Sequence, residues 1–153
     1  MTENNQNKAP TLQILSQYIK DLSLEAPEIP FVFEGMTQAP QITVNIDVQV
    51  KKTPDEKGYT VDLVTKINAN RTDNNKAVFL LEMTYGALVA LSGTPEQTEP
   101  LLLVEVPHLI FPSVRSIIAT MTREAGLPPL QINPINFAAL YVEKMKNAQQ
   151  KVS

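Results

Sequence analysis

The chain has 153 residues, with 43 % hydrophobic residues and a net charge of −3 at pH 7. This length and composition predict one globular domain with a real core, and the acidic balance argues against nucleic acid and anionic membranes as partners. The chain contains no cysteine, which excludes disulfide frameworks, thiolate zinc sites and cysteine nucleophiles. The start of the sequence has no apolar signal region, and the apolar runs are too short to cross a bilayer, so we expect a cytoplasmic protein.

Polar composition at both ends predicts a disordered N-terminal tail (1–10) and a flexible C-terminal tail (147–153) around a single domain, 11–146. The first patterned segment, Thr11 to Glu25, fits two structures equally well. One face of a helix would carry Leu12, Leu15, Tyr18, Ile19 and Leu22. One face of a strand would carry Leu12, Ile14, Tyr18, Leu22 and Leu24.

Three strands follow. Residues 42–50 alternate apolar and polar, which is typical of a half-buried strand. Residues 53–58 predict a hairpin loop, residues 59–69 a second strand and residues 71–76 a polar turn. From Ala77 to Leu91 every odd position is apolar or aromatic, so one face of this third strand needs a cover along its whole length.

The last third of the chain predicts two helices. Residues 93–99 are expected to be a loop, and Pro112 suits the first turn of a helix that Gly126 and Pro128 end. Asn133 and Pro134 suit the N-cap and first position of the second helix. Strands followed by helices predict an α+β fold: a four-stranded antiparallel sheet with two C-terminal helices packed on one face.

Catalytic chemistry has little support in the sequence. The five glycines are too scattered for a dinucleotide or phosphate loop, and His108 is the only histidine. We therefore expect no catalytic residue, no cofactor and no metal. Carboxylates such as Asp21 with Glu25 remain candidates for acid–base work, but a solvated surface explains them more simply. Glu82 is unusual because it lies in an apolar strand, and a place on the open face of the sheet would resolve its burial cost.

Apolar residues also occur where a loop is expected. Phe31, Val32, Phe33 and Met36 lie between Pro30 and Pro40. They form either a small satellite core under a long loop or the wall of an apolar binding groove.

Three segments resemble the SecB family of export chaperones. They are YIKDLSLEAP (18–27), LIFPSVR (109–115) and residues 130–140 around NPINF (133–137), in the order and spacing of the family. The resemblance covers about Thr11 to Met145. It implies a homotetramer, a dimer of dimers, and it favours a strand for Thr11 to Glu25, paired with the strand from Ala77 to Leu91.

The resemblance also implies site residues. A flat outer face that docks the translocation ATPase SecA would carry Asp21, Glu25, Leu80 and Glu82, which agrees with the parity of each strand. A groove for unfolded client polypeptides would be lined by Val32, Phe33, Ile42, Val44, Phe111, Phe137, Leu140 and Tyr141. Leu81, Met83 and Tyr85 would pack on the long helix and toward the other dimer as the tetramer interface. The C-terminus lacks the acidic tail of some relatives, which puts SecA contact through that tail in doubt.

By this resemblance we expect a chaperone that works without ATP. It would hold unfolded precursor proteins in a translocation-competent state and deliver them to SecA, without inserting into the membrane. Two alternatives remain open: a small acyl-processing enzyme that uses a carboxylate in an apolar pocket, and an adaptor module that binds one folded partner.

Overall fold

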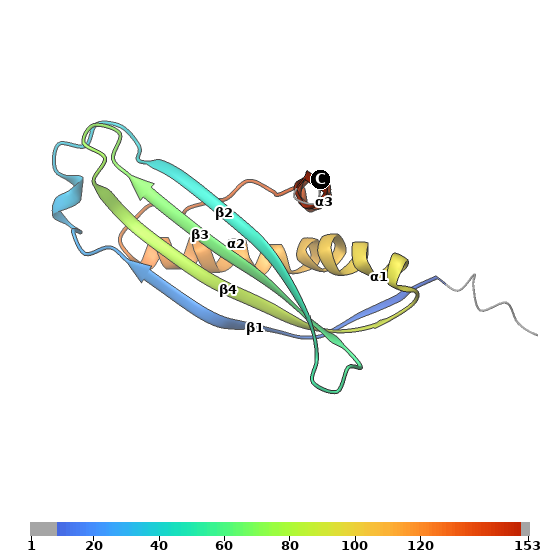
Figure 1. The fold of residues 1–153 in the computed structure, drawn as a ribbon. Helices are drawn as coiled ribbons and strands as arrows, with labels where there is room; N and C mark the ends of the chain where they lie inside the picture. Colours follow the sequence, from blue (N-terminus) through green and yellow to red (C-terminus); the bar gives the residue numbers. More distant parts are fainter. Residues whose placement is uncertain (1–8, 151–153) are drawn as a thin grey trace, which may run out of the picture.

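The computed structural model describes residues 9–150. Most of the expected N-terminal tail (1–8) and the last three residues of the C-terminal tail (151–153) lie outside this range. Residues 147–150, expected in the flexible tail, are the last turn of a helix. The described residues form one antiparallel four-stranded sheet with helices along one of its faces (Figure 1), as the sequence predicts.

The sheet has the strand order β1-β4-β3-β2. Its strands are β1 (Thr11–Glu25), β2 (Gln41–Lys52), β3 (Tyr59–Asn70) and β4 (Ala77–Ser92). The ambiguous first segment is therefore a strand, and it pairs with β4 as expected. Because β1 and β2 are the two edge strands, only β3 and β4 have neighbours on both sides.

The helices differ from the expectation in where they begin. α1 (Pro95–Pro100), a π-helical turn (Leu101–Glu105) and α2 (Val106–Glu124) form one continuous helical run. Residues 95–99, expected in a loop, are helical: Thr94 precedes the first turn, and its N–H donates to Gln97 Oε1 at 3.1 Å.

Prolines explain the error. They suggest helix breaks, yet Pro100, Pro107 and Pro112 all lie within the run. Between the first two, the π turn lets Val106 N–H donate to Leu101 O, five residues back. Pro112 is thus inside α2 and not in its first turn.

The C-terminal helix, α3 (Phe137–Gln150), begins three residues later than expected. Its capping residue is Asn136, whose side-chain oxygen accepts a hydrogen bond from Ala139 N–H at 3.0 Å. Asn133 and Pro134 belong instead to the extended connector between α2 and α3.

By length and mean hydropathy, the run Pro95–Glu124 could also span a bilayer, a test that core helices of soluble proteins pass as well. The run lies along one face of the sheet (Figure 1). Its inward side chains belong to the core, which accounts for much of this apolar composition. They include Val106, Ile110, Val114 and Ile118, each fully buried.

The odd positions of β4 form the centre of the core. Leu81, Met83 and Tyr85 have exposed fractions of 0, 1 and 8 % within the single chain. They face the helices as expected and belong to the core of the single chain. Their part in a tetramer interface stays a prediction, and the single chain already buries their side chains.

Replacing Leu81 with alanine should lower the free energy of unfolding by about 2–5 kcal/mol, the usual cost of such a truncation in a packed core. Chemical denaturation at fixed protein concentration measures this change. Val142→Ala removes two methyl groups from a side chain that is 51 % exposed, and should change stability by less than about 0.5 kcal/mol. A Leu81→Ala variant with unchanged stability but reduced assembly mass would support the interface assignment.

Candidate functional site

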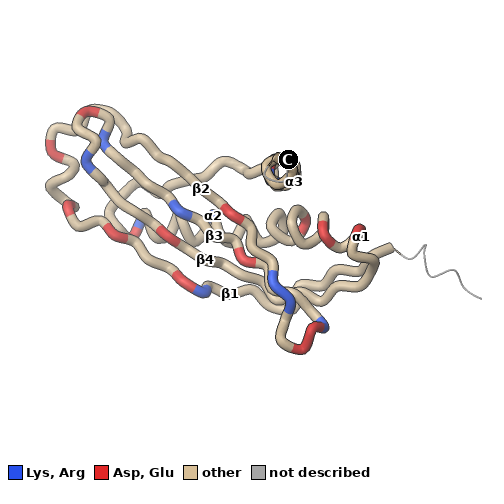
Figure 2. Tube along the Cα trace, viewed as in Figure 1, with Lys and Arg blue, Asp and Glu red and all other residues tan. Residues whose placement is uncertain are grey.

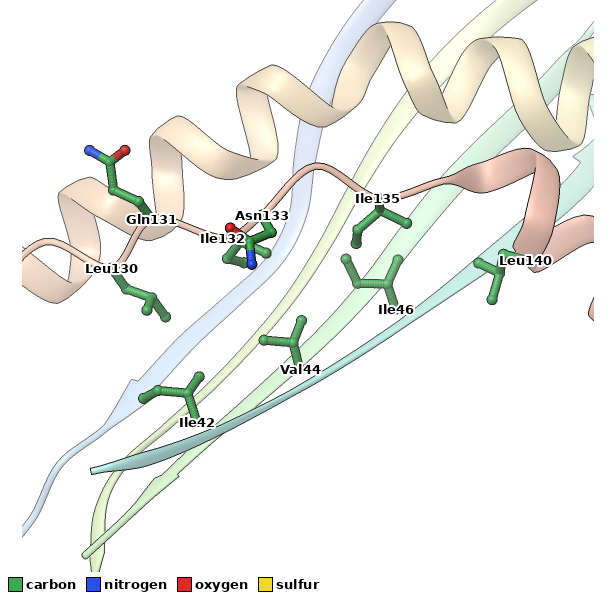
Figure 3. A pocket seen from close by; sticks show the side chains of 9 residues that line it. All are labelled: Ile42, Val44, Ile46, Leu130, Gln131, Ile132, Asn133, Ile135 and Leu140. Atoms are coloured by element: carbon green, nitrogen blue, oxygen red, sulfur yellow. The ribbon is translucent and has the colours of Figure 1, made fainter. Parts of the chain in front are cut away.

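An apolar groove runs along the helix-facing side of β2 (Figure 3). It consists of two adjoining hollows of about 510 and 570 Å³ that share Ile42 and Leu130. The first lies between β2, the α2–α3 connector and α3, and is lined chiefly by Ile42, Val44, Ile46, Leu130, Ile132, Ile135 and Leu140. The second lies under the crossover loop that joins β1 to β2, and is lined chiefly by Phe33, Met36, Pro40, Phe79, Leu127 and Pro129.

Strand alternation explains the floor of the groove. Ile42, Val44 and Ile46 pair with Ala69, Ile67 and Thr65 of β3, and all six share the helix-facing side of the sheet. The β3 residues are buried, whereas the β2 residues remain partly exposed. Because β2 is an edge strand covered here by the extended connector, its apolar face stays accessible from Ile42 to Ile46, whereas Val48 further along is buried.

A buried hydroxyl anchors the connector. Thr122, which is fully buried in α2, donates to Ile118 O and accepts a hydrogen bond from Leu130 N–H, both at 2.9 Å. Between these points the chain turns at Gly126, whose φ of +87° favours glycine. These contacts fix the position of the connector, which forms one wall of the groove beside β2.

α3 closes the other end of the groove. Lys144 forms an ion pair with Asp47 and donates to Val48 O at 3.1 Å, so the helix is fastened to the edge of β2. Phe137 packs edge-to-face on Phe111 of α2 with ring centroids 5.6 Å apart. Leu140, one turn further along α3, lines the groove.

The crossover loop is held by one buried guanidinium. Arg71, at the end of β3, donates to the carbonyls of Val32 and Glu34 at 2.7 and 2.6 Å. Its Nε and Nη2 bind both oxygens of Asp73 at 2.9 and 2.6 Å. These bonds lower the pKa of Asp73 and raise that of Arg71. The loop that carries Phe33 is therefore tied to the β3–β4 turn.

Four of the eight expected groove residues line the groove: Phe33, Ile42, Val44 and Leu140. Three others are buried core residues: Val32, Phe111 and Phe137 are 3, 5 and 3 % exposed. Tyr141 is half-buried on α3 and lines neither hollow. Val32 and Phe33 thus divide the apolar loop between core and groove.

Sequence reasoning missed the connector. Leu130, Ile132 and Ile135 form much of the groove wall, although they lie in a segment without helix or strand. The available signal was the recurrence of apolar residues in a proline-containing stretch between two helices.

The opposite face of the sheet is uncovered by helices and brings together the four residues expected at a docking surface. Glu25 pairs with Leu80, Asp21 with Thr84 and Ser23 with Glu82, so all of these side chains share the outer face. Figure 2 shows acidic positions along β1 and, beside them, Glu82, which is the one acidic residue of β4. Lys66 of β3 lies 3.8 Å from Glu82, but both side chains are about half exposed, and such pairs contribute little.

The positions of Glu82 and His108 are relevant to the enzyme alternative, which requires a carboxylate in an apolar pocket. Glu82 lies on the open face of the sheet and not in an apolar pocket, and His108 is exposed on α2. Within residues 9–150, no three metal-ligating side chains come together.

Comparison with known proteins decides the family. A model of the family described as preprotein translocase subunit SecB matches residues 5–148. The chain belongs to the SecB family. It is 40 % identical to the protein-export protein SecB of Granulibacter bethesdensis, covering 99 % of this chain and 94 % of that protein. It is 43 % identical to protein-export protein SecB 1 of Gluconobacter oxydans, in an alignment that covers 93 % of this chain and 86 % of that protein.

A solved structure supports the same fold. A SecB-like chaperone from Mycobacterium tuberculosis, in complex with a peptide from an antitoxin, has a TM-score of 0.66 at 15 % identity. The similarity covers 81 % of this chain and 90 % of that one. The family and the fold together give this SecB protein a chaperone role in protein export.

Arg71→Met should loosen the crossover loop, because it leaves two loop carbonyls without their buried donor, at a cost of about 1–3 kcal/mol each. Faster proteolysis within residues 26–40 would report the loosening. Arg123→Met removes the same charge from an exposed side chain that forms an ion pair with its neighbour Glu124, and should leave the loop unchanged. Equal cleavage in both variants would contradict this anchor.

Proposed function

We propose that this SecB protein is an ATP-independent holdase that binds unfolded precursor proteins and keeps them competent for translocation. The observation that carries the proposal is the open apolar groove along β2, bounded by Ile42, Leu130 and Leu140. An extended chain could place apolar side chains in it, whereas a folded protein has already buried its own. The related chaperone solved with a bound peptide supports this use of the fold.

The physical basis is hydrophobic burial without chemistry. Full burial of one client Leu, Val or Phe side chain contributes about 1.5–3 kcal/mol, before the entropy of ordering the segment is subtracted. A single short segment therefore binds weakly. Binding only the unfolded state displaces the folding equilibrium away from the native client, and several grooves acting on one chain would strengthen capture through effective concentration.

We further propose that the protein assembles as a homotetramer, a dimer of dimers. The support is apolar helix surface that the subunit leaves uncovered: Leu109 is 51 % exposed on α2, and Ile117 and Met121 are only partly buried. Surfaces of this kind mark contacts between copies. A monomeric mass by light scattering at micromolar concentration would contradict this assembly.

The outer face is the proposed docking surface for SecA. Asp21 and Glu25 are exposed there, with Leu80 and Glu82 beside them. The face lies on the side of the sheet opposite to the groove, so a loaded client need not block it. Acidic residues would steer the complex toward a basic surface on SecA, in a step that weakens as salt rises. With this role we propose a cytoplasmic location, where precursors await export.

Val44→Asp should weaken the delay that the protein imposes on refolding of a slowly folding precursor, raising the protein concentration needed for half-maximal delay about tenfold, roughly 1.4 kcal/mol. The new carboxylate would be desolvated by any apolar client segment. Refolding is followed by fluorescence without ATP. Thr43→Asp is the matched control, because Thr43 is the neighbouring residue on the other face of β2.

Equal loss of delay in both variants would contradict the groove. Capture of native proteins, with no effect on unfolded ones, would instead favour the adaptor alternative.

Reversing charge in the double variant Asp21→Lys, Glu25→Lys should weaken SecA binding about tenfold or more, roughly 1.4 kcal/mol, and leave client capture unchanged. Calorimetry at low and high salt measures the effect, which should shrink as salt rises. Glu99→Lys, Glu143→Lys makes the same charge change at exposed positions away from this face. Loss of client capture together with SecA binding would mean that the two residues are structural.

A further inference from the structure

β1 changes the face of its side chains twice along its length. Leu12 and Ile14 pair with Leu91 and Val89 on the helix side, but the register shifts after Ile14 and again after Ile19. The residues skipped by the pairing are Leu15 and Lys20. Each is the extra residue of a β-bulge, which turns the following residues to the opposite face.

The second bulge decides where the acidic residues point. With unbroken alternation from Tyr18, which pairs with Gly86 on the outer face, Asp21 and Glu25 would lie on the helix side. The bulge at Lys20 instead places both on the outer face and turns Leu22 and Leu24 toward the core. The docking surface proposed above therefore requires this bulge.

An ion pair between an exposed lysine and a buried carboxylate lies at the bulge: the Lys20 side chain is 50 % exposed. Lys20 Nζ lies 2.9 Å from Asp62 Oδ2, and the Asp62 side chain is only 7 % exposed although no helix covers this face. The other carboxylate oxygen, Oδ1, is buried without a hydrogen-bond partner. The contact with Asp62 raises the pKa of Lys20. Lys20 is thus the counter-charge on which a desolvated carboxylate depends.

The cover over Asp62 comes from Tyr18. Its ring crosses Gly86 so closely that an added Cβ at Gly86 would lie 2.7 Å from the ring and 2.5 Å from Asp62 Oδ1. Burial, with the charge of Asp62, raises the pKa of Tyr18. Tyr18, Gly86 and Asp62 are cross-strand neighbours on β1, β4 and β3, so the ion pair ties the edge strand to the centre of the sheet.

We propose that Lys20 and Asp62 are positioning residues that hold the bulge of β1 and so fix Asp21 and Glu25 on the outer face. The link to SecA rests on the proposed function, whereas the positioning itself does not. Without Lys20, the buried carboxylate lacks its counter-charge, and β1 opens at the bulge to let water reach it. The acidic residues next to the bulge then lose their fixed place.

The absence of natural cysteine allows a direct test of the bulge. A Leu22→Cys reporter, half-buried on the helix side, is alkylated in the assembled protein with and without Lys20→Met. We expect alkylation to be about tenfold faster with Lys20→Met and unchanged with Lys20→Arg. Lys66→Met is the matched control, because it removes the same charge from the outer face away from the bulge. Equal rates in Lys20→Met and Lys66→Met would overturn the proposal.

A double variant tests whether Lys20 acts by compensating the charge of Asp62 or has a general structural role. Adding Asp62→Asn to Lys20→Met removes the uncompensated charge, so alkylation should return toward the parent rate; an additive defect would overturn the proposal. If Lys20→Met does not assemble, the milder Lys20→Gln replaces it, with the same expected direction.

SecA affinity provides the functional readout. Lys20→Met makes the outer face more acidic, which by charge alone would strengthen binding to a basic partner. We expect the opposite, SecA binding about fivefold weaker, because Asp21 and Glu25 lose their fixed place. Lys66→Met should bind SecA equally well or more tightly. Faster alkylation with unchanged SecA affinity would overturn the docking proposal but support the positioning pair. Unchanged alkylation would overturn the pair whatever SecA does.

Discussion

The structure depends on an edge strand whose apolar face is left without a full cover. The long helix buries the corresponding faces of β3 and β4, but Ile42, Val44 and Ile46 of β2 lie beneath only the extended connector. Leaving such residues accessible forgoes hydrophobic stabilisation of about 25 cal/mol per Å². Thr122 holds the start of the connector to α2, and Lys144 fastens α3 to the edge of β2, so both walls of the groove have fixed positions. An opening maintained in this way is available to another chain.

Strand alternation gives the sheet two separate surfaces. Neighbouring residues such as Thr43 and Val44 point to opposite faces, so a polar outer face and an apolar groove share the same four strands. On β1 the same alternation is interrupted by two bulges, and the acidic residues reach the outer face only because of the second. The proposed client capture and the proposed SecA docking would then be open to separate alteration, because they are assigned to different sides of one sheet.

Much of the fold could be predicted from the sequence because β2, β3 and, from Phe79 onward, β4 alternate without interruption. β1 was ambiguous because bulges at Leu15 and Lys20 break its period, and Tyr18 consequently lies on the face opposite to that of Leu22. The start of the long helix was missed because its prolines resemble helix breakers. The groove was predicted only in part: Phe111 and Phe33 are both apolar, and only tertiary packing makes the first a core residue and the second a wall.

The most direct test of the open groove is site-specific photo-crosslinking from Ile135, which lines it. A photoreactive amino acid is placed at Ile135 or, as a control, at exposed Val142 on α3, and each protein is mixed with an unfolded precursor. The account predicts strong crosslinks to the precursor from position 135, weak ones from position 142, and none from either position to the folded precursor. Equal crosslinking from both positions, or none from position 135, would contradict it.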